Sequence, residues 1–153
     1  MHRRVDDELA LVDYYPAYDT ALAWYQDPQL CRQVDNLDGV YSLEKLKAMY
    51  TYLTTHGECY YIEYNGKLVG DAALVGDTVC LVVCREYQNR HIGRRCVQAL
   101  AELAAEKGRT RLRARICPFN KQSQAMFRAA GFTCAGDDWY LLPLPAAAKG
   151  QNN

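Results

Sequence analysis

Hydrophobic and polar positions repeat with two different periods along the chain, and these periods predict its elements. Spacings near 3.6 residues indicate helices, whereas alternation or short apolar runs indicate strands. The clearest helical stripe follows Ser42, a favourable N-cap residue, and stops at Gly57. The clearest hairpin surrounds Asn65-Gly66, because both residues accept the positive φ that a type I′ turn requires.

The same pattern predicts the remaining elements and an α/β (α+β) fold. Strands are expected at Leu9–Tyr15, Glu58–Tyr64, Lys67–Leu74, Val79–Cys84, Arg111–Ile116, 133–134 and 139–142, and helices at Ala17–Gln26, 43–56, Ile92–Glu106 and 120–130. Residues 29–41 are polar and predict a loop. The order β-α-α-β-β-β-α-β-α-β-β implies a mixed, mostly antiparallel sheet with helices on both faces. We expect one domain over residues 1–144 and a disordered tail over 145–153.

A basic turn joins the strand that ends at Cys84 to the helix that follows. Gln88 to Arg95 contains three arginines and one glycine, directly before the apolar stripe of the helix. A helix that begins here directs its free backbone N–H groups and its positive dipole end at one spot, which suits a phosphate. The alternative is a solvated basic turn between two core elements.

Charge is balanced overall but unevenly distributed. Residues 1–86 carry 7 Lys/Arg against 14 Asp/Glu, and residues 87–153 carry 11 against 4. The second half is therefore suited to an anion and the first half to a cation, unless the halves simply complement each other. We expect no nucleic-acid partner, since net charge is zero and Arg111, Arg113 and Arg115 alternate with apolar residues.

The seven cysteines and the apolar runs indicate the cellular compartment of the protein and whether it spans a membrane. The cysteines are scattered and odd in number, which is typical of buried thiols in a reducing compartment. No CxxC is present, so we expect no metal site. No apolar run has a membrane-spanning length, and the acidic N-terminal segment is unlike a signal peptide. These features favour a cytoplasmic protein without a membrane partner.

Two motifs on these elements resemble those of the GNAT superfamily of acyl-CoA-dependent N-acetyltransferases. Leu81 to Arg94 is similar to the strand-to-helix pyrophosphate loop of that family, with its Gln/Arg-x-x-Gly-x-Gly/Ala pattern. Asn120 to Phe132 is similar to the second signature, an Asn-x-x-Ser helix that ends in Gly-Phe. The resemblance extends from the first strand to Leu144, and both motifs fall on the elements expected to carry them.

The resemblance implies acetyl-CoA as cofactor and names the residues that would hold it. The backbone of Leu81, Val82 and Val83 would pair with the pantetheine arm, and Asn120, Ser123 and Phe127 would flank the thioester. The N–H groups of the loop would surround the pyrophosphate: Gln88, Asn89, Arg90, His91, Ile92, Gly93 and Arg94. By the same analogy, the strand at 79–84 and the strand at 111–116 would separate to admit the cofactor.

The chain departs from the family pattern at two positions. His91 replaces the first glycine of the loop, where positive φ is needed, and histidine tolerates that conformation better than most side chains. Phe127 stands where many members carry a tyrosine that protonates the leaving thiolate. Tyr140, Cys84 or a water would then supply the proton, or the thiolate would leave unassisted.

The acceptor amine must lose a proton before it attacks a thioester, so a base is required. Asp71 is polar within an otherwise apolar strand and is the leading candidate, ahead of Glu58 and Glu63. By analogy with the family, the first two helices and the 29–41 loop would form the acceptor pocket. Its aromatic residues would be Trp24, Tyr25, Tyr41 and Tyr60, with Asp35 and Asp38 nearby to favour a cationic amine.

These features predict an N-acetyltransferase that moves an acetyl group directly to a primary amine of a small molecule or peptide. The alternative is a catalytically weak acyl-CoA-binding sensor or interaction module, which Phe127 and His91 motivate. Since dimers are common in the family, a homodimer is also expected.

Overall fold

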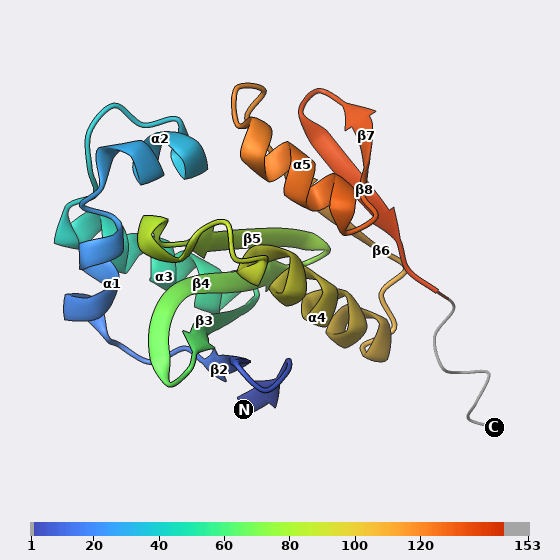
Figure 1. The fold of residues 1–153 in the computed structure, drawn as a ribbon, viewed down its shortest axis with the longest axis horizontal. Helices are drawn as coiled ribbons and strands as arrows, with labels where there is room; N and C mark the ends of the chain where they lie inside the picture. The colour runs from blue at the N-terminus through green and yellow to red at the C-terminus, as the bar shows by residue number, and fades with distance from the viewer. Residues whose placement is uncertain (1, 146–153) are drawn as a thin grey trace.

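The computed structural model describes residues 2–145, and a divided sheet is its central feature (Figure 1). The strands are β1 (His2–Arg4), β2 (Leu9–Asp13), β3 (Glu58–Tyr64), β4 (Lys67–Val75), β5 (Thr78–Val83), β6 (Arg111–Arg115), β7 (Thr133–Gly136) and β8 (Trp139–Pro143). The α-helices are α1 (Tyr18–Trp24), α2 (Pro28–Asp35), α3 (Leu43–His56), α4 (Ile92–Glu106) and α5 (Lys121–Ala129), and a short 3₁₀ turn, η1, spans Arg85–Tyr87.

The strands follow the order β1-β2-β3-β4-β5-β6-β8-β7, antiparallel except between β5 and β6. β4 pairs with β5 along six positions, whereas β5 pairs with β6 only at Thr78 and Arg113. Beyond this point β5 and β6 separate, as the resemblance implied. The mixed, mostly antiparallel sheet with helices on both faces is confirmed.

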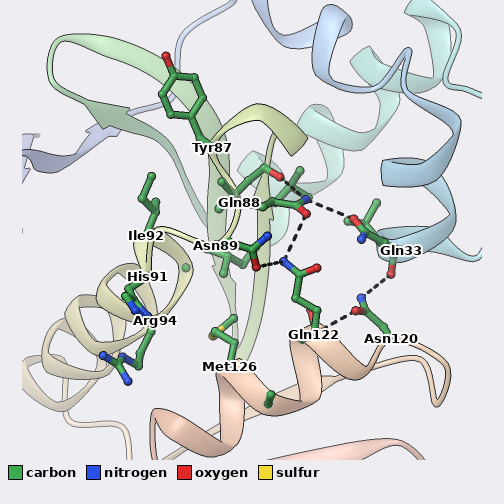
Figure 2. A pocket seen from close by; sticks show the side chains of 17 residues that line it. Gln33, Tyr87, Gln88, Asn89, His91, Ile92, Arg94, Asn120, Gln122 and Met126 are labelled. Atoms are coloured by element: carbon green, nitrogen blue, oxygen red, sulfur yellow. Dashed lines mark hydrogen bonds between the residues drawn. The ribbon is translucent and has the colours of Figure 1, made fainter.

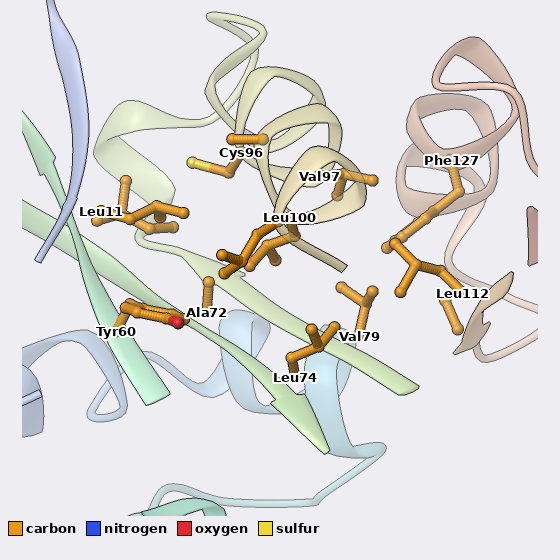
Figure 3. Close-up of a cluster of buried hydrophobic side chains, with 14 of the residues drawn as sticks. Leu11, Tyr60, Ala72, Leu74, Val79, Cys96, Val97, Leu100, Leu112 and Phe127 are labelled. Carbon is orange, nitrogen blue, oxygen red and sulfur yellow. The ribbon is translucent and has the colours of Figure 1, made fainter. Parts of the chain in front are cut away.

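Each face of the sheet carries its own apolar cluster. Side chains of α4 and α5, including Leu100 and Phe127, pack with Leu74 and Leu112 on one face (Figure 3). Side chains of α1, α2 and α3, including Leu30 and Leu46, pack on the other face. Figure 1 shows α4 in front of the sheet and α3 behind it. Successive side chains of a strand point to opposite faces, so neighbouring strand residues belong to different clusters.

Two elements correct the sequence prediction. Residues His2–Arg4 form an edge strand, β1, that pairs with β2. Within 29–41, expected as a loop, residues Pro28–Asp35 form α2. Asp27 accepts hydrogen bonds from the N–H groups of Gln29 and Leu30, and Pro28 occupies the first helical position. The Asp27-Pro28 pair, which follows the first predicted helix, therefore starts the next one. The predicted tail lies, except for residue 145, outside the described residues.

Among residues 2–145, no helix is both long enough and apolar enough to cross a membrane.

Candidate functional site

A cavity of about 350 Å³ lies where β5, the start of α4 and α5 meet; we call it the outer cavity. It gathers eleven of the thirteen residues expected to bind the cofactor: Leu81, Val82, Val83, Gln88, Asn89, His91, Ile92, Gly93, Arg94, Asn120 and Ser123. Arg90 and Phe127 are not among its lining residues. The two sequence motifs are separate in the chain but line the same outer cavity.

The first turn of α4 lies on the wall of the outer cavity, and no side chain in the described part of the protein caps it. His91, the N-cap, has φ 59° and ψ 18°, and its side chain makes no capping hydrogen bond. The positive φ expected from the family pattern is present, and histidine adopts it here. Gly93 lies close to Leu81 and Met126: a Cβ there would be 3.3 Å from Leu81 Cδ2 and 3.4 Å from Met126 Cε. The glycine therefore allows α4, β5 and α5 to approach closely.

The basic residues at this turn have different surroundings. Arg94 lines the outer cavity. The guanidinium of Arg90 stacks over the ring of Tyr87, 4.9 Å from its centroid. Arg95 donates to Asp6 and Glu8, each at 2.9 Å, and so fastens α4 to the N-terminal segment. Of the three arginines, only Arg94 is among the residues that line the cavity.

Past Thr78, the edge of β5 that faces β6 has no strand partner among residues 2–145. The N–H of Arg113 donates to the carbonyl of Asp77 at 2.7 Å, at the one point of pairing. Because backbone groups alternate in direction along a strand, Leu81 and Val83 direct theirs to the same edge, whereas Val82 pairs with Asp71 of β4. An extended ligand could add to this edge as a further strand does.

A network of side-chain amides crosses the outer cavity (Figure 2). Gln88 donates to the carbonyl of Val83 at 2.9 Å and to Gln33 of α2 at 3.2 Å. Asn120 donates to the carbonyl of Gln33 at 3.1 Å, and Gln122 donates to Gln88 at 3.3 Å. Three elements distant in sequence are thus linked by neutral groups. Gln88 occupies the Val83 carbonyl that an added strand would use.

A second cavity of about 250 Å³, the inner cavity, continues between β5 and β6 toward α1 and α3. It shares lining residues with the outer cavity: Gln33, Val34, Leu81, Val82, Asn120 and Ser123. Tyr25, Tyr41, Met49 and Leu53 add an aromatic and apolar wall, and Asp71 also faces this space. The two cavities therefore form one passage through the opening in the sheet.

Asp71 is the buried charged residue of this passage, with 2% of its surface exposed. The hydroxyls of Tyr25 and Tyr50 both donate to its Oδ2, at 2.7 and 2.8 Å. Within the described residues, Oδ1 accepts no hydrogen bond. Burial raises the pKa of Asp71 to about 6, although the two hydroxyls act in the opposite direction. A carboxyl group with this pKa is ionised at neutral pH and can accept a proton.

The four aromatic residues expected in the acceptor pocket do not all lie together. Tyr25 and Tyr41 contact each other with their rings tilted by 35° and centroids 4.7 Å apart, and both line the inner cavity. Trp24 is buried on the same face of the sheet and contacts Tyr61 edge-on. Tyr60 is buried on the opposite face, among the α4 side chains (Figure 3). The expectation for Tyr60 is corrected, because alternation along β3 turns Tyr61 toward the acceptor side and Tyr60 away from it.

The other expected acidic groups are held in ion pairs or lie elsewhere. Asp35 accepts from Tyr41 and pairs with Lys45, and Asp38 pairs with Arg32. Glu58 pairs with Lys107 at 3.5 Å and does not line the inner cavity. Glu63, opposite Ala10 in the β2–β3 ladder, does not line it either. Of the three candidate bases, Asp71 is the one that faces the passage.

The candidate proton donors for the thiolate are also separated from the cavities. Tyr140 is buried beneath α5, and its hydroxyl accepts from Arg128 at 3.3 Å. Phe127 lines the inner cavity and packs edge-on against Phe132, with no proton to give. Cys84 is not among the lining residues of either cavity. The structure therefore does not bring Tyr140 or Cys84 to the passage.

Several lining residues, and one hydrogen-bond partner of Asp71, could not be identified from the sequence. Gln33 and Val34 lie on α2, which was expected as a loop, and Tyr50 is one of several apolar positions on the α3 stripe. Arg115 and Cys117 line the inner cavity at the end of β6. The Asp27-Pro28 pair was the available signal for α2, but nothing local marked Tyr50 as a partner of Asp71. Within the described residues, no group of three His, Cys, Asp or Glu side chains could hold a metal ion.

Sequence comparison identifies the family to which this site belongs. The profile of the acetyltransferase (GNAT) family matches residues 17–132, which is more than half of the chain. The chain belongs to the GNAT family. Membership confirms the resemblance carried by the two motifs and the expected enzyme class, an acyl-CoA-dependent acetyltransferase. No curated protein matches the sequence.

Solved structures of GNAT proteins share the fold at low sequence identity. One is an acetyltransferase from Salmonella typhimurium that modifies the N-terminal serine of ribosomal protein L7/L12, with 18% identity, TM-score 0.77 and coverage of 95% of this chain and 100% of that chain. Another is spermidine N-acetyltransferase from Vibrio cholerae in complex with CoA and spermine, with 10% identity, TM-score 0.77 and coverage of 90% and 96%. A GNAT acetyltransferase from Bacillus anthracis has 15% identity, TM-score 0.77 and coverage of 94% and 98%.

Proposed function

We propose that this GNAT protein transfers an acetyl group from acetyl-CoA directly to a primary amine of a small molecule or peptide, with Asp71 as the proton acceptor. The observation that carries the proposal is the buried Asp71 carboxylate, which faces a passage continuous with the expected cofactor groove. The relatives of this fold include an enzyme that acts on a protein N-terminus and a polyamine acetyltransferase, both of which acetylate amines.

The residues of the outer cavity fit acetyl-CoA. The uncapped first turn of α4 and Arg94 suit its diphosphate. Gly93, without a Cβ, lets this turn lie close to Leu81 and Met126. The free edge of β5 at Leu81 and Val83 suits an extended amide-bearing arm once the Gln88 side chain leaves the Val83 carbonyl. When bound, acetyl-CoA supplies an activated acetyl thioester.

Asp71 is suited to take the proton that the amine nitrogen loses. Tyr25 and Tyr50 both donate to its Oδ2, which leaves Oδ1 to accept the proton, and the raised pKa places the carboxylate near the optimum for a base at neutral pH. The adjacent rings of Tyr25 and Tyr41 would contact a cationic amine on its way to this carboxylate. Since Phe127 carries no proton, solvent water supplies the one that the departing thiol needs.

The shared wall of the two cavities supports direct transfer. The lining residues common to both, including Asn120 and Ser123, join the expected cofactor cavity to the cavity that Asp71 lines. Amine and acyl donor can therefore meet in one passage without an acylated side chain of the protein.

The test measures release of the CoA thiol across a panel of primary amines, for wild type and Asp71→Asn over pH 5–9. We expect wild-type kcat/KM to rise with pH through about 6, as Asp71 loses its proton. Loss of a general base costs about 100-fold or more, so Asp71→Asn should be slower by that order at pH 7. The deficit should shrink at high pH, where the free amine no longer needs a base.

Glu63→Gln is the matched control, because it removes a carboxylate one strand away that does not line the cavity. An unaltered pH–rate profile in Asp71→Asn would remove Asp71 from the mechanism. Tight acetyl-CoA binding without turnover on any amine would instead favour the acyl-CoA-binding module that Phe127 motivates.

A further inference from the structure

Three arginines alternate along β6, and only two of them have partners within the described residues. Arg111 and Arg113 each donate through Nε to Asp77, at 2.9 and 3.0 Å. The guanidinium of Arg113 also lies over the ring of Trp139, 4.7 Å from its centroid. Arg115 makes no hydrogen bond or ion pair in the described part of the chain and is exposed. The same strand therefore carries two structural arginines and one free guanidinium.

The free guanidinium lies at the inner cavity. Leu112 and Ala114 turn into the α4 face of the sheet, so the arginines of β6 point to the other face, which Tyr25 and Tyr41 share. Arg115 lines the inner cavity together with Asp71. Among the described residues of that lining, Asp71 is the one carboxylate and Arg115 the one guanidinium. A buried negative group and an exposed positive group thus bound the same space.

The cavity is small and has a mixed character that restricts its occupant. Its volume of about 250 Å³ is below the usual range of sites for drug-sized ligands, roughly 300–1,000 Å³. Met49, Leu53 and the two tyrosines leave an apolar wall between the charges. An occupant that satisfies every part of this lining carries an amine, a short apolar body and an anionic group.

We propose that the acceptor is a small amino carboxylate, with its amine directed to Asp71 and its carboxylate held by Arg115. This inference rests on the proposed function, because it concerns the acceptor of the same reaction. A guanidinium holds a carboxylate through two parallel N–H donors, and such charged hydrogen bonds are among the stronger ones in proteins. Arg115 is thereby a specificity-determining residue, and a polyamine, which has no carboxylate, is a poor acceptor.

The experiment compares acceptors that differ only at the carboxylate. Leucine, leucinamide and isopentylamine share the apolar body that Met49 and Leu53 accommodate, and kcat/KM is measured for each with acetyl-CoA. We expect wild type to favour leucine over leucinamide by roughly tenfold or more, the order of one charged hydrogen-bonding pair. In Arg115→Gln this ratio should fall to about 1, whereas Arg111→Gln, on the same face and held by Asp77, should keep the wild-type ratio.

Binding measurements separate this inference from the proposed function. Calorimetric titration of leucine and leucinamide into the CoA-loaded protein reports selectivity even when no thiol is released. Selective binding that Arg115→Gln abolishes would support the inference, with or without turnover. Equal or absent binding of the two ligands, a preference for spermidine, or an Arg115→Gln ratio equal to that of wild type would overturn it. Absence of thiol release with selective binding intact would count against the acetyl transfer alone.

Discussion

The sequence shows that Asp71 is an unusual residue in its strand, but it does not show what surrounds Asp71 in the fold. A carboxylate within the apolar run of β4 is visible as an exception in the pattern, and this exception led to its candidacy. Its environment is not visible, because Tyr25 and Tyr50 are 46 and 21 residues away and reach it from the end of α1 and from α3. The raised pKa follows from that tertiary burial rather than from any local signal.

Burial of Asp71 makes the folded state less stable as pH rises. The folded pKa of about 6 lies above the ordinary value of 3.8, so the native state holds the proton more tightly between these values. The stability that protonation contributes is present below pH 4 and is lost as pH rises through 6. Relative to Asp71→Asn, wild type should lose about 3 kcal/mol of unfolding free energy across this window, at about 1.4 kcal/mol per pKa unit.

Urea unfolding of both proteins at pH 4, 5, 6 and 7 measures this difference, and comparison with the variant cancels the other titrating groups. A difference in unfolding free energy that stays constant from pH 4 to 7 would contradict a raised pKa of Asp71.

Helices with a clear apolar stripe and the Asn65-Gly66 hairpin were predicted from the sequence, whereas two short elements were missed. The α3, α4 and α5 stripes and the Asn65-Gly66 hairpin were placed within a few residues, because pattern and caps agree there. The three-residue β1 was missed because it is too short to show a period, and the eight-residue α2 was missed because its polar composition was interpreted as a loop. Because α2 was not predicted, a site residue was also missed: Gln33 of α2 joins the amide network over the outer cavity.

The start of α4 gives a sharp test of the cofactor site. Gly93→Ala adds a Cβ at 3.3–3.4 Å from flexible ends of Leu81 and Met126, so it should fold and bind CoA with only a few-fold loss. Gly93→Asp adds more bulk and a negative charge beside the expected diphosphate, and should weaken CoA binding by at least 100-fold. Calorimetric titration with CoA compares both variants with wild type, and far-UV circular dichroism checks that each is folded. Equal affinities of Gly93→Asp and Gly93→Ala would refute the location of the diphosphate.

The division of the sheet into two ladders determines which parts of the molecule a ligand in the passage would contact. β1 to β5 form one continuous ladder, and β6, β8 and β7 form another, joined at Thr78 and Arg113. The family resemblance implied that β5 and β6 separate, but nothing in the sequence marked Thr78 and Arg113 as the position where they pair. A ligand in the passage contacts both halves at once.

Amide hydrogen exchange should therefore reveal the cofactor along one edge of β5. With saturating CoA, the N–H groups of Leu81 and Val83 should exchange more slowly, whereas that of Val82 already pairs with β4. The melting temperature should rise as well, by an amount equivalent to about 2.7 kcal/mol at a ligand concentration 100 times Kd. Protection of Val82 without protection of Leu81 and Val83 would place the ligand elsewhere.

The point at which β5 and β6 stop pairing also sets the size of molecule that the protein admits. Asp77 holds Arg111 and Arg113 beside the single pair at Thr78, so the angle between the strands is fixed from its closed end. One further pair of hydrogen-bonded residues between β5 and β6 would shorten the opening between these strands, and loss of the existing pair would lengthen it. The side chains that line the cavities would be the same in each case. Selectivity for acceptor length can thus evolve through the register of two strands, far from the atoms that react.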